Sequence, residues 1–199
     1  MKDIILKLGL AVVIIVLGYM IYASLMKPIH FNEARSQREV EVIQRLKDIR
    51  TAQSFFKQAN SRYTKSFDSL INFIQRYEIP VVKLIPDPSD TTFTKTIADT
   101  LGYVKVSDSL FSKRKSFNVN DLRFVPHSNG KIIELNAGSI DRGGVKVSVF
   151  EAKIPFKDYL AGLEEQRINN LAASREDINK FGGLKVGSMD EPSTDGNWE

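Results

Sequence analysis

The chain has 199 residues, of which 42% are hydrophobic and 26% charged, and its net charge is +4. These values exclude an intrinsically disordered chain and a protein with several membrane spans, and they suit one soluble domain beside an anchor. Cysteine is absent, which excludes disulfides and thiolate sites, and Lys and Arg are too scattered to indicate a nucleic-acid partner.

Residues Leu8 to Met26 form an apolar segment without a charge. As a helix it would extend about 28 Å, close to the hydrocarbon thickness of a bilayer. The sequence therefore predicts a short cytoplasmic N-terminus over 1–7 and a single-pass transmembrane anchor over 8–26. A cleaved signal peptide is the main alternative, but the apolar run is longer than such peptides need, and Ala23-Ser24 gives a poor cleavage site.

The charges that flank the anchor leave its orientation open. Two lysines, Lys2 and Lys7, precede it, whereas Lys27, Arg35 and Arg38 are among those that follow. A literal count of basic residues would place the larger part of the chain in the cytoplasm. Long folded segments are translocated largely regardless of charge, so we expect a bacterial inner-membrane protein with its C-terminal domain in the periplasm.

Two helices are predicted after the anchor. The stretch from Asn32 to Ala59 has apolar residues at three- and four-residue steps, which is typical of an amphipathic helix. We expect Asn32 to cap this helix and Asn60-Ser61-Arg62 to end it. A second helix is expected from Phe67 to Arg76, capped by Ser66. The apolar residues expected to face inward from this second helix are Leu70, Ile71 and Ile74.

Strand signals dominate the next seventy residues. Ile79 to Ile85 contains Pro80, which favours an edge strand, and Pro86 to Asp90 favours a turn. A hairpin turn is expected at Ser128-Asn129-Gly130, and another turn from Gly138 to Gly144. The other predicted strands are Tyr103 to Val106, Leu122 to Val125, Lys131 to Leu135 and Val145 to Phe150.

The C-terminal part is expected to add one helical region and one strand. Tyr159 to Lys180 is predicted to be helical, in one or two pieces, and Leu184 to Val186 to form a short strand. Residues 189–199 are expected to be a mobile tail. The predicted fold class is therefore α+β. The transmembrane helix is expected to continue into the amphipathic helix, which packs on an antiparallel β-meander with an extra C-terminal helix, in one domain over 27–188.

Residues in the first 75 positions carry a resemblance to a known family. Arg50-Thr51-Ala52-Gln53, Phe55-Phe56 and Asn60-Ser61-Arg62-Tyr63 precede the short Phe67 to Leu70 segment. This order resembles that of type IV pilins and pseudopilins, in which a helix ending in an aromatic pair is followed by a polar turn with a tyrosine and a second short helix. The resemblance implies a pilin-like fold.

The resemblance does not extend to the residues of pilin processing. In that family the leader is cut after a glycine, and a Glu at the fifth mature position aligns neighbouring subunits. If Gly9 were the cleavage glycine, Leu10 and Ile14 would occupy the first and fifth positions. The resemblance therefore implies the fold and not filament assembly. Gly183 to Ser188 and Gly196 to Glu199 also resemble uncharacterised cell-envelope proteins of Bacteroidota bacteria, which implies no activity.

Candidate catalytic and metal-binding residues are few. The two histidines, His30 and His127, have no metal-ligand spacing, and no serine lies in a G-x-S-x-G elbow. We therefore predict no enzyme activity, no cofactor and no metal site. The acidic tail, with Asp190, Glu191, Asp195 and Glu199, lacks the spacing of an EF-hand loop, and calcium binding stays open. Lys113-Arg114-Lys115 is interpreted as a solvated loop.

These observations favour a non-enzymatic, membrane-anchored structural or interaction subunit of a bacterial cell-envelope assembly, related to pilins or to secretion. The expected partners are the lipid bilayer and other envelope proteins or further copies of the chain. The alternative is a stand-alone membrane-tethered periplasmic binding module for a cell-wall or peptide ligand. Candidate interaction residues are Val42, Ile43, Leu46, Ile49, Phe56 and Trp198.

Overall fold

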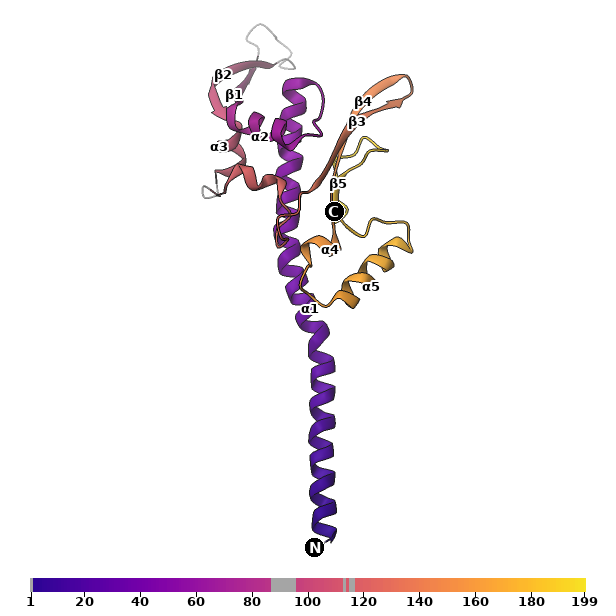
Figure 1. Cartoon of the computed structure of the whole chain (residues 1–199). Helices are drawn as coiled ribbons and strands as arrows, with labels where there is room; N and C mark the ends of the chain where they lie inside the picture. Colours follow the sequence, from indigo (N-terminus) through magenta and orange to yellow (C-terminus); the bar gives the residue numbers. More distant parts are fainter. Residues whose placement is uncertain (1, 87–95, 113, 115–116) are drawn as a thin grey trace.

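A computed structural model describes residues 2–86, 96–112, 114 and 117–199 of the chain, and Figure 1 shows its elements. The fold is α+β: one long N-terminal helix, two antiparallel sheets and a C-terminal helix. In chain order the elements are α1 (Lys2–Asn60), α2 (Phe67–Arg76), β1 (Glu78–Pro86), β2 (Thr96–Lys105), α3 (Val106–Phe111), the 3₁₀ helix η1 (Val119–Arg123), β3 (Glu134–Arg142), β4 (Val145–Pro155), α4 (Phe156–Tyr159), α5 (Glu165–Glu176) and β5 (Gly183–Gly187).

The apolar segment and the predicted amphipathic helix form one continuous helix of 59 residues. Asn32 lies inside α1, so the expected helix start at that residue is wrong. Pro28 is also internal, and it lacks the N–H that would donate to the carbonyl of Ser24. The predicted end is confirmed: α1 stops at Asn60, and Ser61 adopts a left-handed backbone with φ of 58°.

Helix α2 begins and ends where the sequence predicts. The Ser66 hydroxyl oxygen accepts a hydrogen bond from the backbone N–H of Ser69 at 3.3 Å, which satisfies one of the free donors of the first turn. Leu70, Ile71 and Ile74 are buried, as expected from their spacing.

The strands form two separate sheets, so the expected single meander is wrong. Strands β1 and β2 pair antiparallel in a two-stranded sheet, and β3, β4 and β5 form a three-stranded antiparallel sheet in that order. Strand β1 confirms the predicted edge strand at Ile79 to Ile85. Strand β2 is longer than predicted, and Val106 begins α3 instead of ending a strand. Most of the predicted turn at Pro86 to Asp90 lies outside the described residues.

The predicted hairpin before β3 is much shorter than expected. Leu122 lies in η1, and one isolated bridge joins Phe124 to Ile132. Strand β3 then continues through most of the expected 138–144 turn, because its residues pair in register with β4 as far as Arg142. The turn itself is Gly143-Gly144, whose φ angles of 63° and 85° suit a two-residue hairpin.

The C-terminal end, predicted to be a mobile tail, is attached to the sheet. The predicted helical region splits into α4 and α5, and β5 confirms the predicted strand. Beyond β5, Gly196 bridges Val186, and the backbone N–H of Gly187 donates to the carbonyl of Asp195 at 2.9 Å. The tail therefore covers the open edge of β5 by backbone hydrogen bonding, which composition does not reveal.

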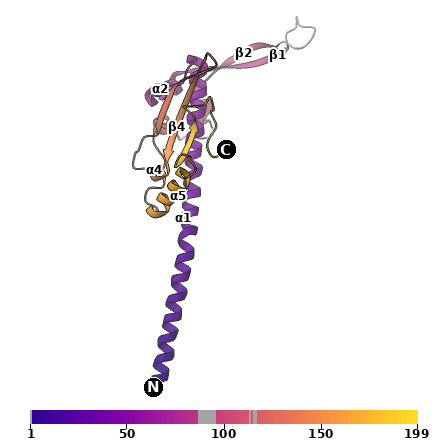
Figure 2. The same cartoon turned by 90° about the vertical axis from the view of Figure 1, so that its right-hand side faces the viewer.

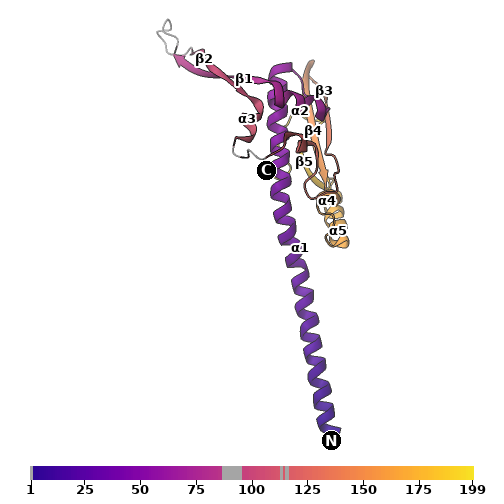
Figure 3. The same cartoon turned by 60° about the vertical axis from the view of Figure 1, so that its left-hand side comes forward.

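The hydrophobic core surrounds the second half of α1 and includes side chains from the three-stranded sheet, α2, α3, η1 and α4. Figures 1 and 3 both show that sheet on one side of α1 and the β1–β2 pair, with α3, on the other. Phe31 is the first residue of α1 in the core cluster. The largest buried side chains from the sheet and from α4 are Phe150, Ile154, Phe156 and Tyr159.

Candidate membrane anchor and interaction surfaces

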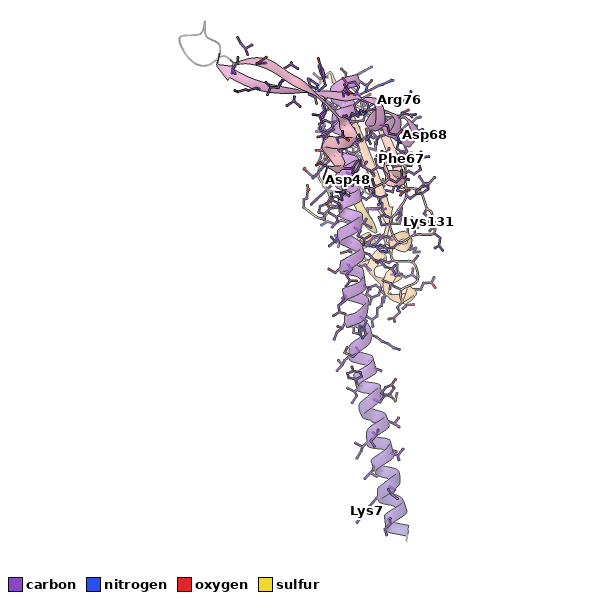
Figure 4. The ribbon with its side chains drawn as sticks, turned by 90° about the vertical axis from the view of Figure 1, so that its left-hand side faces the viewer. Lys7, Asp48, Phe67, Asp68, Arg76 and Lys131 are labelled. Carbon is purple, nitrogen blue, oxygen red and sulfur yellow. The ribbon has the colours of Figure 1, made fainter. Side chains whose placement is uncertain are left out.

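The apolar segment of α1 is not covered by any other part of the described chain. Its large apolar side chains from Leu8 to Tyr22 are 50–71% exposed, and the apolar window is not buried at all. In Figure 4, Lys7 lies near the free end of α1, far from Asp48 on the part that the domain covers. Among the described residues, α1 is the one helix that is long and apolar enough to cross a membrane, either as an anchor or as a signal segment.

Half of the predicted interaction residues lie in the domain's own core. Val42, Leu46 and Ile49 are fully buried, at 0% exposure, in the hydrophobic core of the domain. The sequence predicts that the apolar face of α1 is a possible partner surface, but other elements of the same chain cover these three residues. These three residues therefore stabilise the fold and are not accessible to a partner.

The other three predicted residues are partly exposed. Ile43, Phe56 and Trp198 are half-buried and pack against the core. The Phe56 ring meets the Phe73 ring edge-to-face at 5.2 Å, and Phe56 also lines a surface hollow. The indole nitrogen of Trp198 is buried without a hydrogen-bond partner in the described residues. Phe56 is thus the predicted residue whose position best suits a contact outside the core.

The hollow beside Phe56 has a volume of about 500 Å³ and lies between the α1–α2 connection and the β3–β4 hairpin. Basic and hydroxyl side chains dominate its rim. Gln53 holds the α1–α2 connection in place. Its fully buried side-chain amide donates to the carbonyl of Thr64 at 2.6 Å and accepts from the Thr64 N–H at 3.1 Å. The residues that line the hollow include Arg62, Tyr63, Lys65, Ser69, Ser139 and Ser148.

Polar contacts fix the lower end of the domain on α1. The Tyr159 hydroxyl donates to the Glu39 carboxylate at 2.9 Å, and Arg35 donates to the same carboxylate at 2.7 Å. Arg38 donates to the carbonyls of Tyr159 and Ala161 at 3.0 and 2.9 Å. Burial and the neighbouring Glu39 charge raise the pKa of Tyr159 far above its ordinary value. The phenol is therefore a permanent donor that ties α4 to α1.

A second polar cluster lies on the three-stranded sheet. Glu151 is buried, and Lys153 and Lys185 contact its two carboxylate oxygens at 2.6 and 2.9 Å. Burial raises the pKa of Glu151, but the hydrogen bonds and charges of the two lysines together outweigh burial and hold that pKa below its ordinary value. The two lysines compensate the carboxylate charge, so this cluster stabilises the sheet.

The two histidines lie apart and each has an acidic neighbour. His30 Nδ1 is 3.7 Å from Glu33, one turn along α1, and His127 Nε2 is 3.1 Å from Glu41. Within the part of the chain that the structure describes, no group of three or more His, Asp or Glu side chains is arranged to hold a metal ion. The tail carboxylate of Glu199 instead accepts from Arg50 at 2.8 Å.

A surface that the sequence did not predict lies on β1 and β2, which we call the arm (residues 78–86 and 96–105). Figures 2 and 4 show the arm projecting away from the rest of the domain near the C-terminal end of α1. Its exposed large apolar residues are Val81, Val82, Ile97, Leu101, Tyr103 and Val104. The 96–105 segment lacks a clear alternation of apolar and polar residues, so no sequence signal marked this surface.

Comparisons with protein-family models, with curated proteins and with solved structures found no match to this chain.

Proposed function

We propose that this chain is a non-enzymatic, membrane-anchored subunit of a bacterial cell-envelope assembly, with a pilin-like domain held in the periplasm. The observation that carries the proposal is the unbroken α1, whose exposed apolar half continues directly into the central core helix of the domain. Because no flexible linker separates the two halves, this helix fixes the position of the domain relative to the apolar segment, as expected of a structural subunit.

The distance between the apolar segment and the core supports this role. Phe31, the first core residue of α1, follows Met26 by five residues, which is about 7.5 Å of helix. With lipid around Leu8 to Met26, the lower end of the domain would stand against the headgroups. The upper end, at Asn60, would stand about 50 Å above Met26. Other proteins anchored in the same membrane would therefore contact the lateral surfaces of this domain.

The exposed arm supports an interaction role over an isolated one. Apolar side chains on a projecting two-stranded sheet are costly to leave in water, since burial of apolar surface contributes about 25 cal/mol per Å². The non-enzymatic part of the proposal rests on the sequence, which lacks a nucleophile elbow or a metal-ligand spacing.

The test is gentle solubilisation of membranes that contain the tagged full chain, followed by size-exclusion chromatography and mass spectrometry. We expect the chain to elute in a complex, either with copies of itself or with the same envelope proteins each time. A chain that repeatedly elutes alone and as a monomer would overturn the proposal.

A control variant tests the anchor separately. Replacing Ile14 and Leu17 by Lys puts two charges in the apolar segment, each of which costs about 2.5–3.5 kcal/mol in a bilayer centre. We expect this variant to leave the membrane fraction while the wild type stays in it. Protease protection on spheroplasts then tests the orientation, since a periplasmic domain is digested without lysis.

The hollow beside Phe56 favours a second candidate function, a membrane-tethered binding module for a cell-wall or peptide ligand. Arg62 and Lys65 on its rim suit a ligand that carries carboxylates. A panel of acidic peptides and cell-wall fragments that raises the thermal stability of a monomeric chain would favour this function over the assembly subunit.

A further inference from the structure

The arm is the least supported part of the described fold. Strands β1 and β2 pair only with each other, and two-stranded sheets are marginally stable in water without a packed face. Leu101 is 64% exposed and Tyr103 is 67% exposed. Together with their neighbours on the arm they form an exposed apolar surface, and large exposed apolar patches mark interaction sites. A surface of this kind is completed by a partner.

The two edges of the arm differ in their ability to pair with another strand. Strand β1 contains Pro80, which has no backbone N–H to donate. Strand β2, from Thr96 to Lys105, contains no proline, so each of its residues has both a donor and an acceptor. Its outer edge has no strand partner within the described ranges. Its register with β1 shifts at Leu101, so the edge that another strand can extend consists of the regular segments on either side of that residue.

The three-stranded sheet offers a matching open edge. The tail covers one end of that sheet by its bridge to β5, whereas β3 forms the other end without a partner in the described chain. Strand β3 is nine residues long, and its central part from Asn136 to Ile140 contains no charge and no proline. Lysine, proline and bulges normally protect such edges, and this one lacks them between its charged ends.

The two open edges lie at corresponding heights and on different sides of α1. Figures 1 and 3 show the arm and the β3–β4 hairpin on opposite sides of the helix, both near its C-terminal end. In a bilayer this level is about 50 Å beyond Met26, too far from the lipid for the arm to insert there. A second copy anchored at the same depth places its own β3 edge at the same level.

We propose that the β2 edge of one copy adds to the β3 edge of a neighbouring copy that is anchored at the same depth in the membrane. This inference rests on the proposed function, since it needs chains anchored side by side. The contact joins two different surfaces, so each copy both donates an arm and accepts one. Such a head-to-tail interface produces a ring when the rotation closes and a chain when it does not. Main-chain hydrogen bonds supply the affinity, as in other cases of strand addition.

The experiment uses the absence of cysteine in the full-length chain. Thr100→Cys marks β2, and Ser139→Cys marks β3, at exposed positions on the two edges. Each variant carries a different tag, both are expressed together in membranes, and a short bis-maleimide reagent is added. We expect cross-links between the two variants and none within either variant alone. A ladder of higher species is expected when both cysteines are placed in one chain.

A second variant tests the apolar surface without a cross-linker. Leu101→Lys combined with Tyr103→Lys is expected to weaken self-association about tenfold or more, because two exposed apolar contacts are lost. Ile178→Lys is the matched control, because Ile178 is 57% exposed and lies after α5, outside both β2 and β3. Circular dichroism confirms that both variants fold.

The outcomes separate this inference from the proposed function. Cross-linking by Thr100→Cys alone would mean that two arms pair with each other, and it would overturn the proposal. Differently tagged wild-type chains that never co-purify, yet bring down other envelope proteins, would overturn this inference and leave the proposed function standing. A chain that is always alone and monomeric would overturn both.

Discussion

Gln53 provides a sharp test of how the top of the domain is held together. Its fully buried side-chain amide both donates to and accepts from the backbone of Thr64, which lies in the connection between α1 and α2. Gln53→Leu keeps a similar volume but removes both hydrogen bonds. The carbonyl and N–H of Thr64 then lose their partners.

The expected loss follows from these two groups. A buried polar group without a partner costs about 1–3 kcal/mol, and Thr64 is half-buried, so water recovers part of that cost. We expect the free energy of unfolding to fall by roughly 2–4 kcal/mol. For a domain of this size, that corresponds to a decrease in Tm of roughly 5–15 °C.

The assay is guanidinium unfolding of the full chain in detergent micelles, followed by the fluorescence of Trp198, the single tryptophan. Gln58→Leu is the control, since Gln58 is exposed on the same helix, and its effect should stay within about 0.5 kcal/mol. Equal effects of the two substitutions would refute the reasoning, as would an unchanged hydrogen-exchange rate of the Thr64 N–H in Gln53→Leu.

Further predictions concern the three-stranded sheet. Because the pKa of Glu151 is lowered in the folded state, its ionised form contributes stability above the ordinary carboxyl range, and this contribution is lost as pH falls through the folded pKa. Urea midpoints measured from neutral pH downward should fall less steeply in Glu151→Gln than in the wild type. At neutral pH, the free energy of unfolding of Glu151→Gln should be about 1.5–3 kcal/mol lower. Gly187 and Gly130 share a φ of 76°, but a Cβ at Gly187 would lie 2.2 Å from the carbonyl oxygen of Phe150, whereas one at Gly130 would meet nothing. We expect Gly130→Ala to lower the free energy of unfolding by about 1–2 kcal/mol through backbone strain alone. Gly187→Ala should lower it clearly further. Equal losses for the two variants in thermal unfolding would contradict the clash.

Local features of the fold were predictable, and pairing between distant segments was not. The Ser66 cap and the spacing of Leu70, Ile71 and Ile74 identify α2, because capping and helical periodicity act within one turn. Asn32 is equally suited to a cap, yet α1 passes through it, because helix on both sides outweighs one side chain. Strand signals identify β1, β4 and β5 but not which strands pair, so the sequence predicts one meander where the structure has two sheets.

The candidate interaction residues show a similar limit. An apolar stripe such as Val42, Leu46 and Ile49 looks the same in sequence whether it faces the chain's own sheet or a partner, and the structure assigns it to the core. The arm was missed for the opposite reason. Leu101 and Tyr103 are isolated apolar residues in a mixed segment, and only the separation of β1–β2 from the core makes them a surface.

The position of Pro28 connects the anchor to the lateral contacts that we propose. It follows Met26 by two residues and precedes Phe31 by three, so it lies between the apolar segment and the first core contact. In a bilayer this is the headgroup level, where water can bond the Ser24 carbonyl that Pro28 leaves without a donor. Any change of helix direction there would tilt the whole domain, because Arg38 and Tyr159 fix it on α1 just above. A small tilt at the base moves the arm, about 50 Å away, by a larger distance, so the geometry at Pro28 would decide whether arms and β3 edges of neighbouring copies meet at one level.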